Sequence, residues 1–175
     1  MIETNRLFIR PFVSADFNDL YEYLSDPSIY VYEPGEPISL DEAKELVSQR
    51  SMGNIFWAVV LKRENKLIGH LYFEQLEPKE RMTWELGYIF NPKYQRKGYA
   101  SEASAALVEY GFAHYHAHRI MARCNPENPA SWKLLEKIGF TREGHFRKNN
   151  FFRKDERGNP IWFDAYEYSM LETDI

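Results

Sequence analysis

The spacing of apolar residues divides the chain into helical and extended segments. Apolar positions recur every three or four residues in 14–26, where Ser14 is expected to cap the helix. They recur again in 39–50, which opens with the capping-box pair Ser39 and Glu42. The stretch between the two helices is rich in proline and glycine, and it is expected to form a loop.

Extended patterns dominate the middle of the chain. Three apolar runs, at 55–62, 67–76 and 82–90, are joined by short polar turns, which predicts an antiparallel meander. The third run leads through a helix at 100–115 into another strand at 118–124. A strand, a helix and a strand in that order favour a parallel pair joined by a right-handed crossover. The sheet is therefore expected to be mixed.

Further elements flank this centre. Residues 6–12 are expected to form a first strand, and strands at 144–152 and 161–171 flank a polar turn. A short helix between these regions ends at Gly139. The length of 175 residues fits one domain, residues 1–175, of the α/β (α+β) class.

Composition narrows the class of protein. The sequence is 44% hydrophobic and 16% aromatic, which supports a packed core, and its formal net charge is −4. No overall positive field and no membrane-length apolar run is present, so neither nucleic acid nor a membrane is expected as a partner. Cys124 is the only cysteine, and the alternating His114, His116 and His118 cross a helix end, where their side chains should diverge. No disulfide and no metal site is expected, and a cytoplasmic location is the natural interpretation.

A basic turn containing a glycine lies where the strand 82–90 leads into the next helix. A helix N-terminus leaves N–H groups without intrahelical partners and attracts anions. Gly98 allows a phosphate to approach the backbone, while Lys93, Arg96 and Lys97 add positive charge. The turn could equally be an ordinary solvated loop. The chain has no G-x-G-x-x-G and no Walker A motif, so the pattern favours a less common cradle for a diphosphate.

The same residues resemble a known family. Gln95 to Ala100 match the Q/R-x-x-G-x-G/A pyrophosphate loop of the GNAT superfamily of N-acetyltransferases. The segments ELGYIF, HRIMARCNPENPASWKLLEKIGF, ETNRLFIRPF and WFDAYEYSML resemble the branch that includes RimJ and RimL, the ribosomal-protein N-terminal acetyltransferases. This resemblance covers nearly the whole chain. It implies the GNAT fold, a mixed and mostly antiparallel twisted sheet with a parallel, splayed central strand pair, flanked by helices.

The resemblance also implies acetyl-CoA as the acetyl donor, without a metal. In the family the pantetheine arm lies between the splayed strands, where backbone groups of β-strand residues bind it as an added strand would. Backbone N–H groups of the loop and the first helical turn would bind the pyrophosphate. The residues implied to contact the cofactor are Tyr88, Ile89, Phe90, Gln95, Arg96, Lys97, Gly98, Tyr99, Ala100, Ser101, Asn128 and Ser131.

Acetyl transfer requires a neutral amine and a protonated leaving group. Glu85, on the strand before the loop, is the candidate general base, or else a strand carboxylate paired with a cation. Ser131 matches a serine of the branch and would protonate the departing thiolate, although it could simply cap a helix after Pro129. Asn128 is implied to contact the pantetheine arm, or is a turn residue. A tyrosine acid elsewhere, such as Tyr168, is the alternative to Ser131.

The acceptor stays open at the level of sequence. The RimJ/RimL likeness suggests a protein N-terminal amine, but that branch also contains enzymes acting on antibiotics, polyamines and amino acids. The segment 30–39, with Glu33 and Glu36, is expected on the acceptor side together with the C-terminal hairpin, and it would suit a cationic acceptor. Asp164 would orient the amine or pair with a basic neighbour. The rival function is a non-catalytic coenzyme A sensor, and either a monomer or a homodimer is compatible with the sequence.

Overall fold

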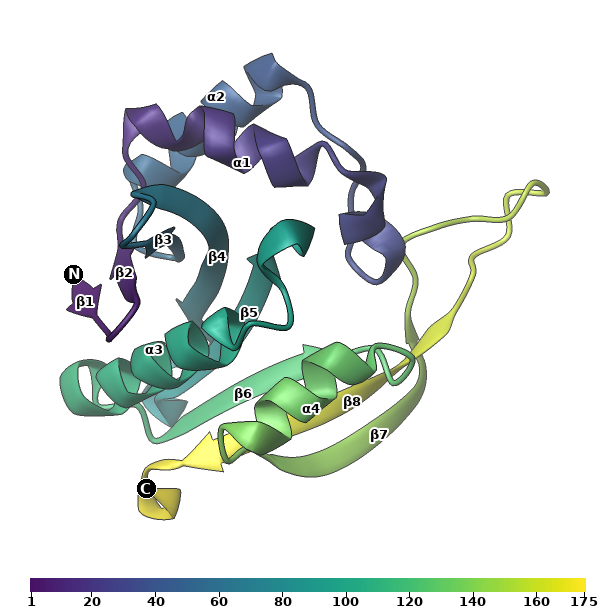
Figure 1. Cartoon of the computed structure of the whole chain (residues 1–175). Coiled ribbons are helices and arrows are strands. Elements are labelled where there is room, and N and C mark those ends of the chain that lie inside the picture. The colour runs from purple at the N-terminus through teal and green to yellow at the C-terminus, as the bar shows by residue number, and fades with distance from the viewer.

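The computed structural model describes residues 1–175 and consists of one eight-stranded sheet with helices on both faces (Figure 1). The strands are β1 (Ile2–Glu3), β2 (Leu7–Arg10), β3 (Phe56–Leu61), β4 (Lys66–Gln75), β5 (Thr83–Phe90), β6 (Arg119–Cys124), β7 (Thr141–Asn150) and β8 (Phe163–Leu171). The helices are α1 (Phe17–Leu24), α2 (Leu40–Ser51), α3 (Tyr99–Tyr115) and α4 (Pro129–Lys137). None of the helices combines the length and the apolar composition that crossing a bilayer requires.

The sheet confirms the predicted mixture of strand directions. Its order is β1-β2-β3-β4-β5-β6-β8-β7, and every neighbouring pair is antiparallel except β5 and β6. The parallel pair is the one joined through α3, because a strand that returns through a helix runs in the same direction as the first. The last strand, β8, lies between β6 and β7. The second strand of the C-terminal hairpin therefore pairs with β6, and the first strand, β7, forms the edge of the sheet.

The parallel pair separates soon after it forms. Its register covers only Thr83–Glu85 opposite Arg119–Met121, while β5 continues along β4 to Phe90 and β6 continues along β8 to Cys124. The splayed central strands expected from the resemblance are therefore present. The part of β5 that follows Glu85 has no strand beside it on the side of β6.

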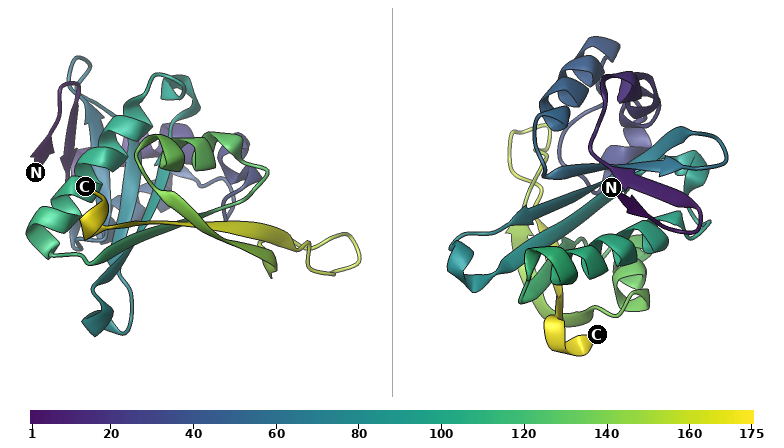
Figure 2. Two further views of the ribbon diagram at one scale, coloured as in Figure 1. Left: turned by 90° about the horizontal axis from the view of Figure 1, so that it is seen from below. Right: turned by 90° about the vertical axis from the view of Figure 1, so that its left-hand side faces the viewer.

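Two hydrophobic clusters hold the helices on the sheet. A cluster of 22 buried residues packs α3 and α4 against one face, and a cluster of 10 packs α1 and α2 against the other. Alternation along β5 assigns its side chains to the two faces: Trp84, Leu86 and Phe90 join the larger cluster, whereas Ile89 packs against the smaller one. Figure 2 shows that the segment between β7 and β8 projects away from this body.

The local predictions have mixed outcomes. The capping box of Ser39 and Glu42 is confirmed, with both reciprocal hydrogen bonds formed. Ser14 as the cap of the first helix is wrong, because Ser14 opens a short 3-10 turn that precedes α1. The carboxylate of Asp16 accepts the Val13 N–H there instead, at 2.8 Å, while it also pairs with Arg10. The expected loop before α2 contains a 3-10 helix at Pro27–Val31, and the last two strands begin three residues earlier and two later than expected.

Candidate active site

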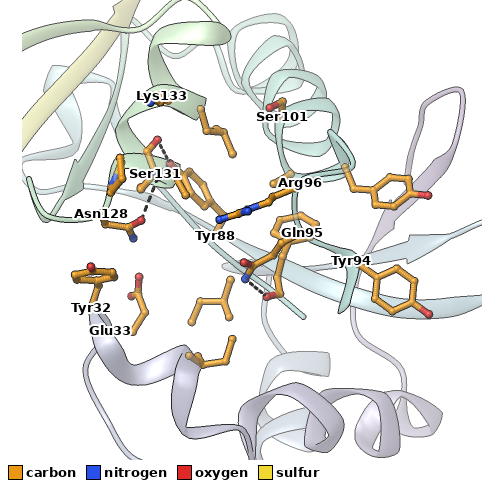
Figure 3. Close-up of a pocket in the computed structure, with 18 of the residues that line it drawn as sticks. Tyr32, Glu33, Tyr88, Tyr94, Gln95, Arg96, Ser101, Asn128, Ser131 and Lys133 are labelled. Carbon is orange, nitrogen blue, oxygen red and sulfur yellow. Dashed lines mark hydrogen bonds between the residues drawn. The ribbon is translucent and has the colours of Figure 1, made fainter. Parts of the chain in front are cut away.

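A cavity of about 810 Å³ opens at the point where β5 and β6 separate. Its walls come from the segment before α2, the end of β5, the loop after β5, the first turn of α3 and one face of α4 (Figure 3). Three stretches that are distant in sequence, within 28–33, 88–101 and 128–137, therefore meet around one space. That space lies directly beside the strand backbone that β6 leaves without a partner.

The loop after β5 presents backbone N–H groups to one end of the cavity. Arg96 and Gly98 both have left-handed backbones, with φ of 58° and 80°. Such a turn curls successive N–H groups around a concavity that suits anions. The N–H of Glu102 makes a helical bond to the Gly98 carbonyl, so the N–H groups that precede it in the first turn of α3 are unpaired. The amide of Gln95 donates to the Phe90 carbonyl at 3.0 Å and ties the loop to the strand end.

An arginine from the other end of the sheet holds this loop. Arg6 donates through Nε to Glu102 at 2.6 Å and through Nη1 to the Lys97 carbonyl at 3.0 Å. Its guanidinium also lies over the Tyr99 ring, 4.5 Å from the centroid. The loop and the start of α3 are therefore fixed by a residue that does not line the cavity.

The positive charges of the loop are distributed differently from the expectation. Lys93 pairs with Glu22 at 2.8 Å, and Lys97 donates to the Lys93 carbonyl, so of the three cations only Arg96 lines the cavity. Lys133 and Lys137 line it from α4, and neither makes an ion pair. These two lysines were not named as site residues from the sequence. Their spacing of four residues on one helix, shortly after Asn128, was the available signal.

The structure brings most of the predicted cofactor residues around the one cavity. Lys97 is the exception, because its side chain lies outside the lining and only its backbone remains near the loop. The Phe90 carbonyl is already occupied by Gln95. The predicted residues that line the cavity are Tyr88, Ile89, Phe90, Gln95, Arg96, Gly98, Tyr99, Ala100, Ser101, Asn128 and Ser131.

A pair of hydroxyl groups joins β5 to α4 inside the cavity. The Tyr88 hydroxyl lies 2.9 Å from Ser131 Oγ and 3.1 Å from the Ser131 carbonyl. Asn128 occupies the N-cap position of α4, and its side-chain oxygen accepts the Ser131 N–H at 3.3 Å. The capping role therefore falls to Asn128, and the Ser131 side chain is free to face the cavity (Figure 3). Burial raises the pKa of Tyr88, so its hydroxyl remains a proton donor.

Glu85 lies outside this cavity. It is half-buried on β5, in register with Glu74 of β4, on the face of the sheet opposite the Tyr88 side chain. Burial raises the pKa of Glu85, Arg123 lowers it and Glu74 raises it further. A carboxyl with a raised pKa fits a base, but a path from Glu85 to the cavity would have to pass the separated strands.

Three other candidates have structural partners elsewhere. Tyr168 is fully buried and its hydroxyl donates to Glu136 at 2.9 Å, away from the cavity. Asp164 pairs with His145 at 2.7 Å, which matches the expectation of a basic neighbour. Burial raises the pKa of Cys124 to about 11. Its thiol stays protonated near neutral pH, which disfavours an acyl-cysteine intermediate.

Comparison with known proteins identifies the family. The acetyltransferase (GNAT) domain family matches residues 6–141. The uncharacterized N-acetyltransferase YnaD of Bacillus subtilis is 42% identical over 172 residues, which cover 98% of this chain and 96% of YnaD. The crystal structure of a GNAT-family acetyltransferase from Bacillus anthracis superimposes with a TM-score of 0.88 at 40% identity, covering 98% of both chains.

A relative with a named acceptor lies further away. The ribosomal protein uS5-alanine N-acetyltransferase of Escherichia coli is 30% identical over 156 residues, which cover 82% of this chain and 79% of that protein. The matched family segment contains the loop, the cavity and the hydroxyl pair described above. The chain belongs to the GNAT family of N-acetyltransferases.

Proposed function

We propose that this protein transfers an acetyl group from acetyl-CoA directly to a primary amine, with a protein N-terminal α-amine as the preferred acceptor. The observation that carries the proposal is the cavity at the separation of β5 and β6, with a nest of backbone N–H groups at one end and the hydroxyl pair of Tyr88 and Ser131 along its wall. An elongated cofactor with a diphosphate in the middle and a thioester at its tip fits this distribution of donors.

The residue roles follow from the chemistry of each wall. N–H groups from Arg96 to Ser101 hold the pyrophosphate, and the side chains of Arg96, Lys133 and Lys137 add positive charge for the phosphates. Backbone groups of Tyr88 and Ile89 bind the pantetheine arm as a neighbouring strand would, and Asn128 lines its path.

The reaction requires an acid for the leaving thiolate and a base for the amine. Ser131 donates its hydroxyl proton to the sulfur, supported by Tyr88 at 2.9 Å. An N–H near Tyr88 or Ile89 stabilises the oxyanion of the tetrahedral intermediate. Glu85 is the candidate base named from the sequence, directly or through water, and a different carboxylate is proposed for this role below.

The preferred acceptor rests on the distant relative that acetylates an alanine of a ribosomal protein. A small-molecule amine, such as an antibiotic, a polyamine or an amino acid, is the second candidate, because the acidic segment before α2 suits any cation. A coenzyme A sensor without turnover is the third. The oligomeric state, a monomer or a homodimer, and a cytoplasmic location stay predictions.

A thiol-release assay tests the function. Peptides with Ala, Ser or Thr at the N-terminus, aminoglycosides, polyamines and free amino acids are each supplied with acetyl-CoA, and free coenzyme A is measured with a thiol reagent. Release that depends on the peptide N-terminus supports the proposal. Tight acetyl-CoA binding without release for any amine would contradict it and favour the sensor.

A further inference from the structure

One carboxylate in the cavity wall has no partner in the protein. Glu33 lies between the 3-10 helix Pro27–Val31 and α2, lines the cavity, is half-buried and makes no hydrogen bond or ion pair. The buried Asp16 pairs with Arg10, and the half-buried Glu22 pairs with both Lys66 and Lys93. Glu85 is also half-buried and unpaired, but it lies outside the cavity. A half-buried carboxylate that has no partner loses hydration without gaining an ion pair, so Glu33 is available to a cation that arrives from outside.

Glu33 lies across the cavity from the proposed acid. Figure 3 shows its carboxylate beside Tyr32 and facing Asn128 and Ser131 on α4. Its negative charge contributes to the raised pKa values of Tyr88 and Cys124, which places it within electrostatic reach of the hydroxyl pair. The carboxylate and the hydroxyl pair therefore flank the part of the cavity where a thioester carbonyl would sit between base and acid.

The surroundings of Glu33 bring the pKa of its carboxyl close to neutral pH. Burial alone raises the pKa of Glu33 to about 7, and no cation is close enough to lower it. The titratable neighbours are Tyr88 of β5 and Cys124 of β6, whose own pKa values are raised by burial, and Tyr32 of the same segment. The cavity cations lie on the loop and on α4, at Arg96, Lys133 and Lys137.

We propose that Glu33 binds the acceptor amine and removes its proton, which makes it the general base of the reaction. The inference rests on the function proposed above. The amine enters as an ammonium ion and pairs with the Glu33 carboxylate, beside the Tyr32 ring, which adds a favourable cation–π face. This assignment competes with Glu85, which lies on the far face of β5.

The protons balance in two steps. The ammonium first gives one proton to Glu33 and becomes a free amine. Its nitrogen then attacks the thioester carbonyl, the C–N bond forms and the C–S bond breaks with its electron pair moving to sulfur. Ser131 gives a proton to the thiolate, and the second amine proton replaces the proton lost by Ser131. Glu33 finally releases its proton to solvent.

The pKa of the amine sets how far uphill the transfer of its proton to Glu33 is. An α-amine has a pKa near 8, so transfer of its proton to Glu33 is uphill by only about ten-fold. A side-chain amine with a pKa near 10.4 makes the same transfer uphill by about 2,500-fold. Glu33 therefore removes a proton from an α-amine about 250 times more readily than from a lysine side chain, a ratio set by the two amines.

Glu33→Gln tests the inference, because it keeps the shape and removes the base. The probes are a lysine-free peptide with an N-terminal alanine and an N-acetylated peptide with a single lysine. The variant should lower kcat/KM for the alanine peptide by about 100-fold or more, while the affinity for acetyl-CoA changes less than about two-fold. Glu36→Gln is the matched control, since Glu36 is exposed on the same segment and lies outside the cavity.

The pH profile separates a base from a merely structural group. In the wild type, kcat/KM for the alanine peptide should level off near pH 7, whereas in Glu33→Gln it should keep rising towards the pKa of the amine, about 8. The melting temperature of Glu33→Gln should be equal or higher, because the variant lacks a buried, unpaired carboxylate.

The outcomes discriminate among the assignments. If Glu33→Gln leaves kcat/KM and its pH profile unchanged, the inference is overturned and the proposed function stays intact. The same holds if Glu85→Gln, and not Glu33→Gln, lowers kcat/KM and changes the pH profile. A wild type that turns over neither peptide nor any other amine would overturn both. A wild type that prefers the lysine peptide would overturn the assignment of α-amines.

Discussion

The Tyr88 hydroxyl has two possible acceptors on Ser131 and one proton to donate. Tyr88 donates to the Ser131 carbonyl or to its Oγ, at 3.1 and 2.9 Å, and it cannot fully satisfy both at once. When Ser131 turns its proton towards a sulfur, Oγ becomes an acceptor and the Tyr88 proton can follow it. In the proposed reaction, the phenol therefore stabilises the oxygen that gives up the proton.

This arrangement predicts that Tyr88→Phe lowers kcat and leaves acetyl-CoA binding nearly intact. The loss of one neutral hydrogen bond, worth about 0.5–1.5 kcal/mol, corresponds to about 2- to 12-fold in kcat. Ser131→Ala should cost more, and the double variant should cost no more than Ser131→Ala, since the phenol acts through the serine. Steady-state thiol release measures all three. Losses that multiply in the double variant would mean that the two hydroxyls act independently.

At the residue scale, the sequence named Ser131 and Asn128 as candidates but did not indicate that the Tyr88 side chain contacts Ser131. Tyr88 was expected to contribute only backbone groups, because nothing in ELGYIF says which helix lies over it. The Tyr88–Ser131 contact joins residues 43 positions apart. From the sequence, Glu33 was only one acid of an acidic segment. That it has no hydrogen-bond or ion-pair partner can be established only from the positions of all its neighbours.

At the scale of elements, the loop that begins α3 is held by the first strands. Arg6 joins Glu102 of α3, the Lys97 carbonyl and the Tyr99 ring, so it links the sheet edge to the helix start. The nest of N–H groups keeps its shape only while these contacts hold. Under the proposed function, we therefore expect Arg6 to position this loop for the cofactor.

Arg6→Ala should weaken acetyl-CoA binding by about ten-fold, because the loop must then be ordered by the ligand itself. Its effect on the free energy of unfolding should be only about 1 kcal/mol, since the arginine side chain is 41% exposed. Arg10→Ala is the matched control: Arg10 pairs with Asp16 at the other end of β2, away from the loop. Calorimetric titration with coenzyme A measures both. Equal affinities in the two variants would contradict the positioning role.

The packing of α1 on β4 contains a buried titratable pair. The Tyr23 hydroxyl and His70 Nδ1 lie 2.7 Å apart, both rings are buried, and Phe12 and Phe56 flank the imidazole. Burial lowers the pKa of His70 well below its usual value, and nearby Arg50 lowers it further. His70 is therefore neutral in the folded protein.

This neutral histidine makes the fold sensitive to acid. Below about pH 6.5, His70 binds a proton in the unfolded chain but not in the folded chain. The free energy of unfolding therefore falls by up to about 1.4 kcal/mol per pH unit until the pKa of His70 in the folded chain is reached. His70→Asn keeps a polar partner for Tyr23 and should flatten the dependence between pH 7 and pH 5.5. Urea unfolding at several pH values measures this slope. His118→Asn, at an exposed histidine, should retain the wild-type slope, and an equally steep slope in His70→Asn would assign the acid sensitivity to other groups.

Regular elements were predictable because their rules are local. The meander of β3, β4 and β5 follows from short polar turns, and the parallel β5–β6 pair follows from the intervening helix. The prediction that Ser14 caps α1 was wrong because Asp16, which pairs with Arg10 of the preceding strand, forms the side-chain contact at this turn. Ser14 makes no capping hydrogen bond. The position of β8 between β6 and β7 depends on which hairpin edge meets the sheet, and no local pattern records that choice.

Viewed as a whole, the molecule is a sheet whose two halves share a short seam. Between β5 and β6 only Thr83–Glu85 and Arg119–Met121 are in register, and beyond that seam the halves are separated by the cavity. A ligand that bridges the loop, β5 and α4 replaces missing strand contacts with its own. Cofactor binding should therefore stabilise the entire fold and not only the loop.

Coenzyme A at about 100 times its Kd should stabilise the wild type by about 2.7 kcal/mol, which for a chain of this size corresponds to a rise in melting temperature of about 5–10 °C. Gly98→Asp should reduce that rise to less than about 1 °C, because it puts a negative charge into the nest of N–H groups. Gly98→Asn is the control: it has the same shape, tolerates the left-handed φ of 80° comparably and meets the same Arg6 nitrogen, 3.3 Å from the new Cβ. It should keep more than half of the wild-type rise. Since the two variants differ only in charge, equal rises in both would mean that the diphosphate binds elsewhere on the protein.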